Sequence, residues 1–141
     1  MRTTTILMTA VLTLALLAPA QSAVWQLTGD GNWNVPGNWS GGVPNAQDAV
    51  ADFSQQNISG NPSVVTLDTN ATVGELIFGR TASGWNELHI TPSATETLAL
   101  DNSSDTTPIS VNDGTGDLRY GVTISAVMTG DDAVTIAVFG A

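Results

Sequence analysis

The sequence contains no cysteine, so disulfide bonds, thiolate metal sites and a cysteine nucleophile are all excluded. Cations are almost as scarce: three arginines and no lysine stand against 13 acidic residues, and the formal net charge is −10. Binding to nucleic acid needs several Lys or Arg side chains that displace counterions from phosphates. Attraction to anionic lipid needs a similar basic patch. The composition therefore excludes nucleic acid and anionic membrane surfaces as partners.

Long apolar runs are also missing, except for one at the N-terminus. Arg2 forms a short basic region, residues 6–17 form an apolar run broken only by Thr9 and Thr13, and small residues follow. This order is typical of a secretory signal peptide. The run is shorter than the ~20 residues that span a bilayer. We therefore expect a cleaved leader and no membrane insertion of the mature chain.

The leader is assigned to residues 1–23. Ala18 and Ala20 satisfy the small-x-small rule for cleavage after Ala20. Cleavage after Ala23 is the second choice, because Gln21 occupies the third position before that cut. The expected localisation is exported, either secreted or at the cell surface.

The mature chain is expected to be one all-β domain. Apolar residues alternate with Thr, Ser, Glu or His in short runs, which is the pattern of half-buried strands. Gly, Asn, Asp and Pro lie between the runs, and these residues favour turns. No helical period is sustained outside the leader. The predicted strands are residues 64–67, 75–78, 87–90, 97–100, 109–111, 122–128 and 134–139.

The regular spacing of these runs permits two architectures. One is a β-sandwich or barrel. The other is a parallel β-helix, in which short strands form coils that stack into a solenoid. The sequence stops at VTIAVFGA, so an apolar strand is left without a polar capping segment. This ending favours the solenoid, with 64–141 as β-strand repeats and the whole as the N-terminal fragment of a longer protein.

Tryptophan is concentrated in residues 24–63, among Gly, Asn and Pro. A solenoid needs bulky side chains to close its open end, and Trp has a large apolar area to bury. This segment is therefore predicted to be a cap. The alternative is a carbohydrate platform, in which exposed indole rings stack on sugars beside amide side chains. The candidate glycan-binding residues are Trp25, Trp33, Trp39, Asn32 and Asn38.

One oxygen cluster is a candidate calcium site. Asp113, Thr115 and Asp117 alternate in the Gly-rich turn NDGTGD, and Ca²⁺ prefers oxygen ligands. The same residues also form Asx turns in proteins that bind no metal. No other cofactor is indicated.

No catalytic site is predicted. His89 is the only histidine and alternates with apolar neighbours, so it is expected on the outer face of a strand. No G-x-S-x-G nucleophile motif occurs. After removal of the leader, Arg80 and Arg119 are the only permanent cations. The paired carboxylates that a glycosidase would use lie in or beside turns: Asp48 with Asp52, Asp101 with Asp105, and Asp131 with Asp132.

Residues 25–53, WQLTGDGNWNVPGNWSGGVPNAQDAVADF, resemble the N-terminal region of exported bacterial proteins with autotransporter-associated β-strand repeats. The segments VVTLDTNATVGELIFG, LHITPSATETLALDN, PISVNDG and GVTISAVMTG are similar to the first coils of that group. The resemblance implies a right-handed parallel β-helix passenger with an adhesive or structural duty, and it does not imply an enzyme. Such proteins are usually far longer and end in a translocator barrel or an anchor, and neither occurs in this chain.

Two functions remain open at this point. The first is an exported surface or adhesin-like structural protein, whose partners would be extracellular glycans or other cell-surface proteins. The second is a secreted carbohydrate-binding β-sandwich module that uses surface tryptophans.

Overall fold

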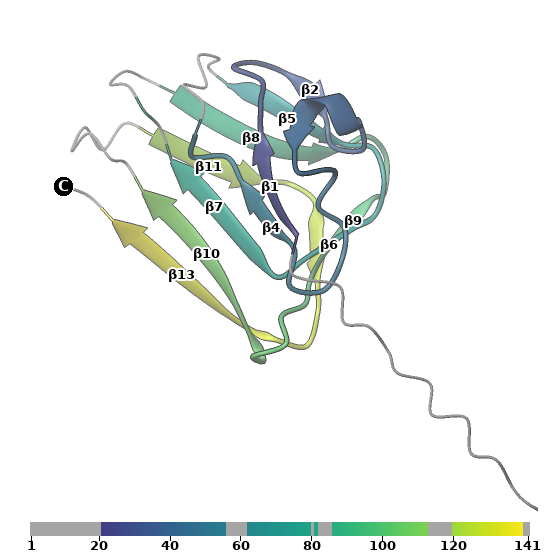
Figure 1. Cartoon of the computed structure of the whole chain (residues 1–141), viewed down its shortest axis with the longest axis vertical. Helices are drawn as coiled ribbons and strands as arrows, with labels where there is room; N and C mark the ends of the chain where they lie inside the picture. The colour runs from purple at the N-terminus through teal and green to yellow at the C-terminus, as the bar shows by residue number, and fades with distance from the viewer. Residues whose placement is uncertain (1–20, 56–61, 80, 82–85, 113–119, 140–141) are drawn as a thin grey trace, which may run out of the picture.

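The computed structural model describes residues 21–55, 62–79, 81, 86–112 and 120–139. Over these ranges the chain consists of β-strands and one 3-10 helix, with no α-helix. The strands form three sheets that together make a β-solenoid of about four turns (Figure 1). The predicted all-β fold and parallel β-helix are confirmed, and the β-sandwich alternative is wrong because consecutive coils stack through parallel strands.

Three strands contribute to each full coil, one in each sheet. The first sheet has the order β13-β10-β7-β4-β1-β3, the second β11-β8-β5-β2, and the third β12-β9-β6. The first contains β1 (Ser22–Trp25), β3 (Trp39–Ser40), β4 (Val50–Asp52), β7 (Glu75–Gly79), β10 (Thr106–Asn112) and β13 (Ala133–Phe139). The second contains β2 (Gly31–Asn32), β5 (Ser63–Leu67), β8 (Asn86–Pro92) and β11 (Tyr120–Ile124). The third contains β6 (Ala71–Val73), β9 (Thr97–Leu100) and β12 (Val127–Thr129), and the 3-10 helix η1 spans Pro36–Asn38.

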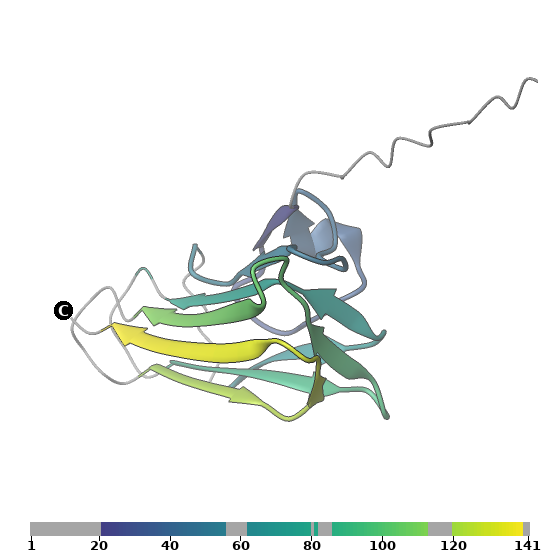
Figure 2. The same cartoon turned by 90° about the horizontal axis from the view of Figure 1, so that it is seen from below.

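The coils are stacked in chain order. Figure 2 follows the first sheet from the blue N-terminal part through β7 and β10 to β13 in yellow. All neighbouring strands pair in parallel except β3, which runs antiparallel to β1. The solenoid therefore has two different ends: β3 covers the N-terminal end, and β13 forms the edge of the first sheet at the other.

The period-two alternation of the sequence places apolar side chains inside the coils. In β5, for example, Ser63, Val65 and Leu67 are buried and the residues between them are only partly buried. The register of the parallel strands then places apolar residues of successive coils on one another: Ala51 pairs with Leu76, which pairs with Ile109. Each inward-facing side chain thus lies on the equivalent residue of the next coil, and together these columns form the core.

Two differences from the sequence-based strands concern the corners between sheets. The run predicted as one strand over 122–128 is two strands, β11 and β12, in different sheets. The chain turns at Ser125, whose N–H donates to the carbonyl of Ile90, while Ala126 stays buried. The strand β6 was not predicted at all. At the corner between β11 and β12, the buried Ala126 continues the alternation of inward-facing residues. The sequence pattern therefore does not reveal that corner.

No helix in the described part of the chain has the length and apolar character needed to cross a membrane. The proposed leader, up to Ala20, lies outside the described residues.

The closest approach between coils predicts a stability effect at Gly74. A Cβ added there would lie 2.4 Å from Cα of Asp48 and 2.8 Å from its backbone nitrogen. Since a backbone cannot rotate away as a side chain can, Gly74→Ala should separate the first two coils and cost about 1–3 kcal/mol of unfolding free energy. Urea denaturation followed by tryptophan fluorescence measures this loss.

The matched control is Gly37→Ala, where an added Cβ meets nothing within 4 Å. Its unfolding free energy should stay within ~0.5 kcal/mol of the parent chain. Equal losses for the two variants would contradict the close approach at Gly74.

Candidate functional site

The most prominent side-chain cluster in the described residues is a group of aromatic rings at the N-terminal end of the solenoid. The rings of Trp25 and Trp39 meet edge to face with centroids 4.9 Å apart, and those of Trp33 and Trp39 do so at 5.1 Å. Below them, Phe53 stacks on Phe78 at 5.4 Å, with an angle of 7° between the ring planes. We call Trp25, Trp33, Trp39, Phe53 and Phe78 the aromatic cap.

A chain reversal brings the cap together. After β2 the chain turns through η1 and returns as β3, so that Trp39 lies opposite Trp25 across the antiparallel pair. Trp33 extends the second sheet, since its backbone N–H donates to the carbonyl of Thr66 at 2.8 Å. Pro at the start of η1 suits this turn because its fixed φ is already helical. The Gly, Asn and Pro residues between the tryptophans thus supply the turns that fold the rings inward.

Hydrogen bonds hold two of the three indoles. The Nε1–H of Trp39 donates to the carbonyl of Trp33 at 2.7 Å, and that of Trp33 donates to the carbonyl of Pro44 at 3.1 Å. The buried Nε1–H of Trp25 has no acceptor within the described part of the chain. The cap therefore combines apolar burial with specific polar anchors at Trp33 and Trp39.

The glycan platform predicted as an alternative needs exposed ring faces, and the structure buries them. Trp25 and Trp33 are 0% exposed and Trp39 is 5% exposed. The amide of Asn38 donates to the carbonyl of Asn32 at 2.8 Å, which fixes the turn before β3. The prediction of a glycan platform is therefore wrong. The rings of these tryptophans pack edge to face inside the core, so no ring face is left on which a sugar could stack.

The corner that leads from the third sheet back to the first carries several acidic and amide side chains. Asp48 adopts a left-handed backbone with φ 61°, and its carboxylate accepts the N–H of Ser103 at 2.6 Å. Asn102 donates from its side-chain amide to the carbonyl of Gly74 at 2.9 Å. Asp132 accepts from the backbone of Asn102 and from the hydroxyl of Thr107. The bonds of Asn102 and Asp132 join one coil to the next, whereas the bond between Asp48 and Ser103 joins residues that are 55 positions apart and thus about two coils apart.

The corner between the second and third sheets is joined in a similar way. The side-chain oxygen of Asn45 accepts the N–H of Thr72 at 2.9 Å, and that of Asn70 accepts the N–H of Thr97 at the same distance. These bridging residues were not predicted from the sequence. The available signal was the recurrence of Asn and Asp directly before or after strand-like runs, where their side chains satisfy backbone groups that no strand pairs with.

Of the candidate carboxylate pairs, Asp52 bonds within a turn and Asp101 bonds to a distant part of the chain. Asp52 accepts both the N–H and the hydroxyl of Ser54, at 2.7 and 2.6 Å. Asp101 accepts from the side-chain amide of Gln47 at 2.9 Å. No group of three or more metal-binding His, Asp or Glu side chains occurs within the ranges that the structure describes. The calcium candidates Asp113, Thr115 and Asp117 lie outside those ranges.

His89 lies on the outer face of β8, as its alternation with buried Leu88 and Ile90 predicts. Its Nε2 is 3.3 Å from a carboxylate oxygen of Glu87, two residues earlier on the same face. On the following turn, backbone hydrogen bonds from Ala94 and from Glu96 itself lower the pKa of the Glu96 carboxyl. Both features belong to an accessible polar surface.

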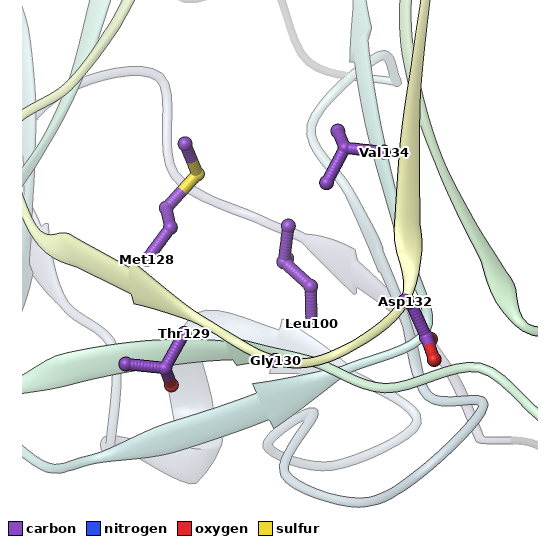
Figure 3. Close-up of a pocket in the computed structure, with 6 residues that line it drawn as sticks. All are labelled: Leu100, Met128, Thr129, Gly130, Asp132 and Val134. Atoms are coloured by element: carbon purple, nitrogen blue, oxygen red, sulfur yellow. The ribbon is translucent and has the colours of Figure 1, made fainter.

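The other end of the solenoid presents a second feature, a small apolar hollow. It has a volume of about 110 Å³. Figure 3 shows the side chains of Met128, Leu100 and Val134 around it, with Asp132 at the corner that precedes β13. A hollow of this size is far below the several hundred cubic ångströms of a typical small-molecule site.

No family model matches the chain, and no curated protein or solved structure is significantly similar to it.

The aromatic cap predicts a graded loss of stability at Trp39. Trp39→Phe keeps a ring but removes the 2.7 Å hydrogen bond to Trp33, which should cost roughly 1 kcal/mol. Trp39→Ala also removes the ring contacts and should cost about 3–5 kcal/mol of unfolding free energy. Thermal unfolding followed by circular dichroism gives the order of the three melting temperatures.

Val35→Ala is the control, because Val35 lies in the same segment but is 41% exposed. Its melting temperature should stay close to that of the parent chain. Equal melting temperatures for Trp39→Ala and Val35→Ala would contradict a stabilising role of the cap.

Proposed function

We propose that this chain is an exported, adhesin-like structural protein of the cell surface, built as a capped β-solenoid. The observation that carries the proposal is the aromatic cap, which closes one end of a stack of parallel coils. A structure of this kind is rigid and extends along one axis, and its outer faces stay accessible to partners. In the described residues, the rings of the aromatic cap and the side chains of Asp48, Asn102 and Asp132 hold the coils together.

The resemblance to exported bacterial proteins with autotransporter-associated β-strand repeats fits this proposal. The segment that carries the resemblance, residues 25–53, folds as the cap and the beginning of the first coils. The similar segments that follow fold as β5 to β12, in successive coils. Stacked parallel coils are the fold that the resemblance implies, and in this way the fold supports the proposal.

Export requires that the leader be removed without damage to the fold, and the contacts of β1 favour one cleavage site. The carbonyl of Gln21 accepts the N–H of Val50 at 2.8 Å. Ala23 is fully buried and pairs with Ala51. Cleavage after Ala23 would remove these contacts with the second coil, whereas cleavage after Ala20 keeps them. The structure thus supports the first of the two predicted sites.

Partners of the proposed adhesin would meet the outer faces of the sheets. In the second sheet, Val64 lies in register with His89 and then Thr123, and Thr66 lies in register with Thr91. These side chains are partly or fully exposed. A face of hydroxyl, imidazole and small apolar groups, with the carboxylate of Glu87 beside His89, suits other cell-surface proteins or extracellular glycans, without a contribution from the buried tryptophans.

Export can be tested by expressing the whole chain with a C-terminal epitope in a bacterial host. We expect the periplasmic or surface fraction to contain a product whose N-terminus, determined by mass spectrometry, is Gln21. Degradation of the epitope when protease is added to intact cells would identify surface display. A full-length product that stays in the cytoplasm would contradict the proposal.

Ala20→Leu places a bulky residue at the cleavage site and should abolish the Gln21 N-terminus. Ala10→Leu is the matched control, because the same substitution inside the apolar run keeps the leader intact. Normal processing of both variants would show that Ala20 does not define the cut.

A further inference from the structure

Three asparagines of the described chain stand in the acceptor pattern of N-glycosylation. The pattern is Asn-x-Ser/Thr, and it marks surface positions of exported proteins. It occurs at Asn38, Asn70 and Asn102, in the triplets NWS, NAT and NSS. A fourth copy, at Asn57, lies outside the described residues. The glycan is attached to the side-chain nitrogen, Nδ2, so the surroundings of that atom decide which asparagine can carry it in this fold.

Asn38 and Asn102 use their side-chain nitrogens to hold the fold. Nδ2 of Asn38 donates to the carbonyl of Asn32 at 2.8 Å, in the turn before β3. Nδ2 of Asn102 donates to the carbonyl of Gly74 at 2.9 Å, between two coils. Both asparagines are partly buried. A sugar on either nitrogen is bulky and would crowd the acceptor against which that nitrogen is packed.

Asn70 is arranged the other way round. Its side-chain oxygen accepts the N–H of Thr97 at 2.9 Å. Because a backbone N–H can only donate, this bond identifies the oxygen of the amide and leaves Nδ2 at its other corner. Nδ2 of Asn70 donates no hydrogen bond within the described residues, and the residue is exposed. An N-glycosylated asparagine keeps its side-chain carbonyl, so the bond to Thr97 is compatible with a glycan.

The surface around Asn70 has room for a glycan. Asn70 lies at the corner between the second and third sheets, after β5 ends at Leu67 and before β6 begins at Ala71. The same corner of the next coil contains residues 93–95, which are all exposed. A glycan on Asn70 therefore borders solvent-exposed turns and no part of the core.

The residues on either side of Asn70 fit the recognition of an acceptor. Thr72 supplies the hydroxyl of the pattern, and Asp68 stands two residues before Asn70. Bacterial oligosaccharyltransferases read an acidic residue at that position in addition to the Asn-x-Ser/Thr pattern. The position is not acidic in the other three copies of the pattern, where it holds Pro36, Gln55 and Leu100.

The pairing of β6 sets the time of the modification. In the folded chain the N–H of Thr72 donates to the side-chain oxygen of Asn45, and its carbonyl accepts the N–H of Ala46, both at 2.9 Å. A transferase needs access to the backbone around its acceptor, so transfer takes place on the exported chain before β6 is paired. The folded state then has to accommodate only the product.

We propose that Asn70 is an N-glycosylation site, modified by an oligosaccharyltransferase that uses a lipid-pyrophosphate-linked oligosaccharide. Nδ2 of Asn70 attacks the anomeric carbon of the first sugar. The bond between nitrogen and carbon forms as the bond from that carbon to the pyrophosphate oxygen breaks. The lipid pyrophosphate leaves with the bonding electrons, and a base of the transferase takes one proton from Nδ2. The inference rests on the proposed function, because this transfer takes place on the exported side of the membrane.

Expression of the whole chain in a bacterial host that carries such a transferase and its lipid-linked donor tests the proposal. We expect mass spectrometry of the periplasmic product to find the glycan on the peptide that contains Asn70. Thr72→Val removes the hydroxyl but keeps a β-branched strand residue, and it should abolish the modification. The matched control is Ser40→Ala, which removes the pattern at Asn38 and should leave the glycan at Asn70 unchanged. An unmodified Asn70 in the periplasmic parent chain, or a Thr72→Val variant that is still modified, would overturn the proposal.

A second arm separates this result from the outcome for export. Residues 1–20 are replaced by the leader of a periplasmic protein of the host, so the mature chain reaches the transferase whether or not its own leader works. Retention of the original chain in the cytoplasm, together with glycosylation of Asn70 in the second arm, would contradict the proposed function and support the site. An unmodified Asn70 in the periplasm of the second arm would overturn the site alone.

The free nitrogen of Asn70 also predicts that the glycan does not weaken the fold. Glycosylated and unmodified chains should have the same melting temperature by circular dichroism, because Thr97 keeps its acceptor. Asn70→Asp is the control, since its carboxylate cannot be glycosylated but still accepts the N–H of Thr97. Asn70→Ala removes the acceptor and should lower the melting temperature. A glycosylated chain that melts as early as Asn70→Ala would show that Nδ2 is needed by the fold, and the proposal would be wrong.

Discussion

In a solenoid each coil buries its apolar interior only against the coils on either side, so the first and the last coil are each one neighbour short. This constraint governs the structure. At the N-terminal end, the chain itself supplies the missing neighbour by reversing through η1 and placing β3 and the aromatic cap over the first coil. Four of the five cap rings come from residues 25–53. This short segment is rich in aromatic residues because it closes the N-terminal end of the solenoid.

The corners solve a second problem that stacking creates. Parallel strands satisfy each other's backbone groups, but at every corner the chain leaves one sheet before it enters the next, and backbone N–H groups lose their strand partners. Asn45 and Asn70 replace those partners with side-chain oxygens from the neighbouring coil, and Asp48 does the same for Ser103, which lies 55 residues later in the chain. Acidic residues that looked like possible catalytic pairs thus have a structural use, since the side-chain oxygens of Asp48 and Asp52 accept backbone hydrogen bonds.

From residue 64 onward the sequence predicted most of the strands because alternation is a local property, but the even recurrence of the runs left both a solenoid and a β-sandwich open. It did not separate β11 from β12, since a corner that buries Ala126 looks like continued alternation. Nor did it decide whether Trp25, Trp33 and Trp39 face the core or solvent. Both outcomes use the same residues, and only the antiparallel return of β3, a contact between distant parts of the chain, turns the rings inward.

The two ends also differ in what covers them. At the N-terminal end, the antiparallel return of β3 and the rings of the aromatic cap cover the interior of the first coil. Along β13 the inward-facing column of the first sheet is exposed instead: Ile136 is 67% exposed, whereas Ile109, its partner in register, is 6% exposed. The same alternation of apolar residues therefore builds both ends. They differ because, within the described residues, the chain folds back over the first coil only.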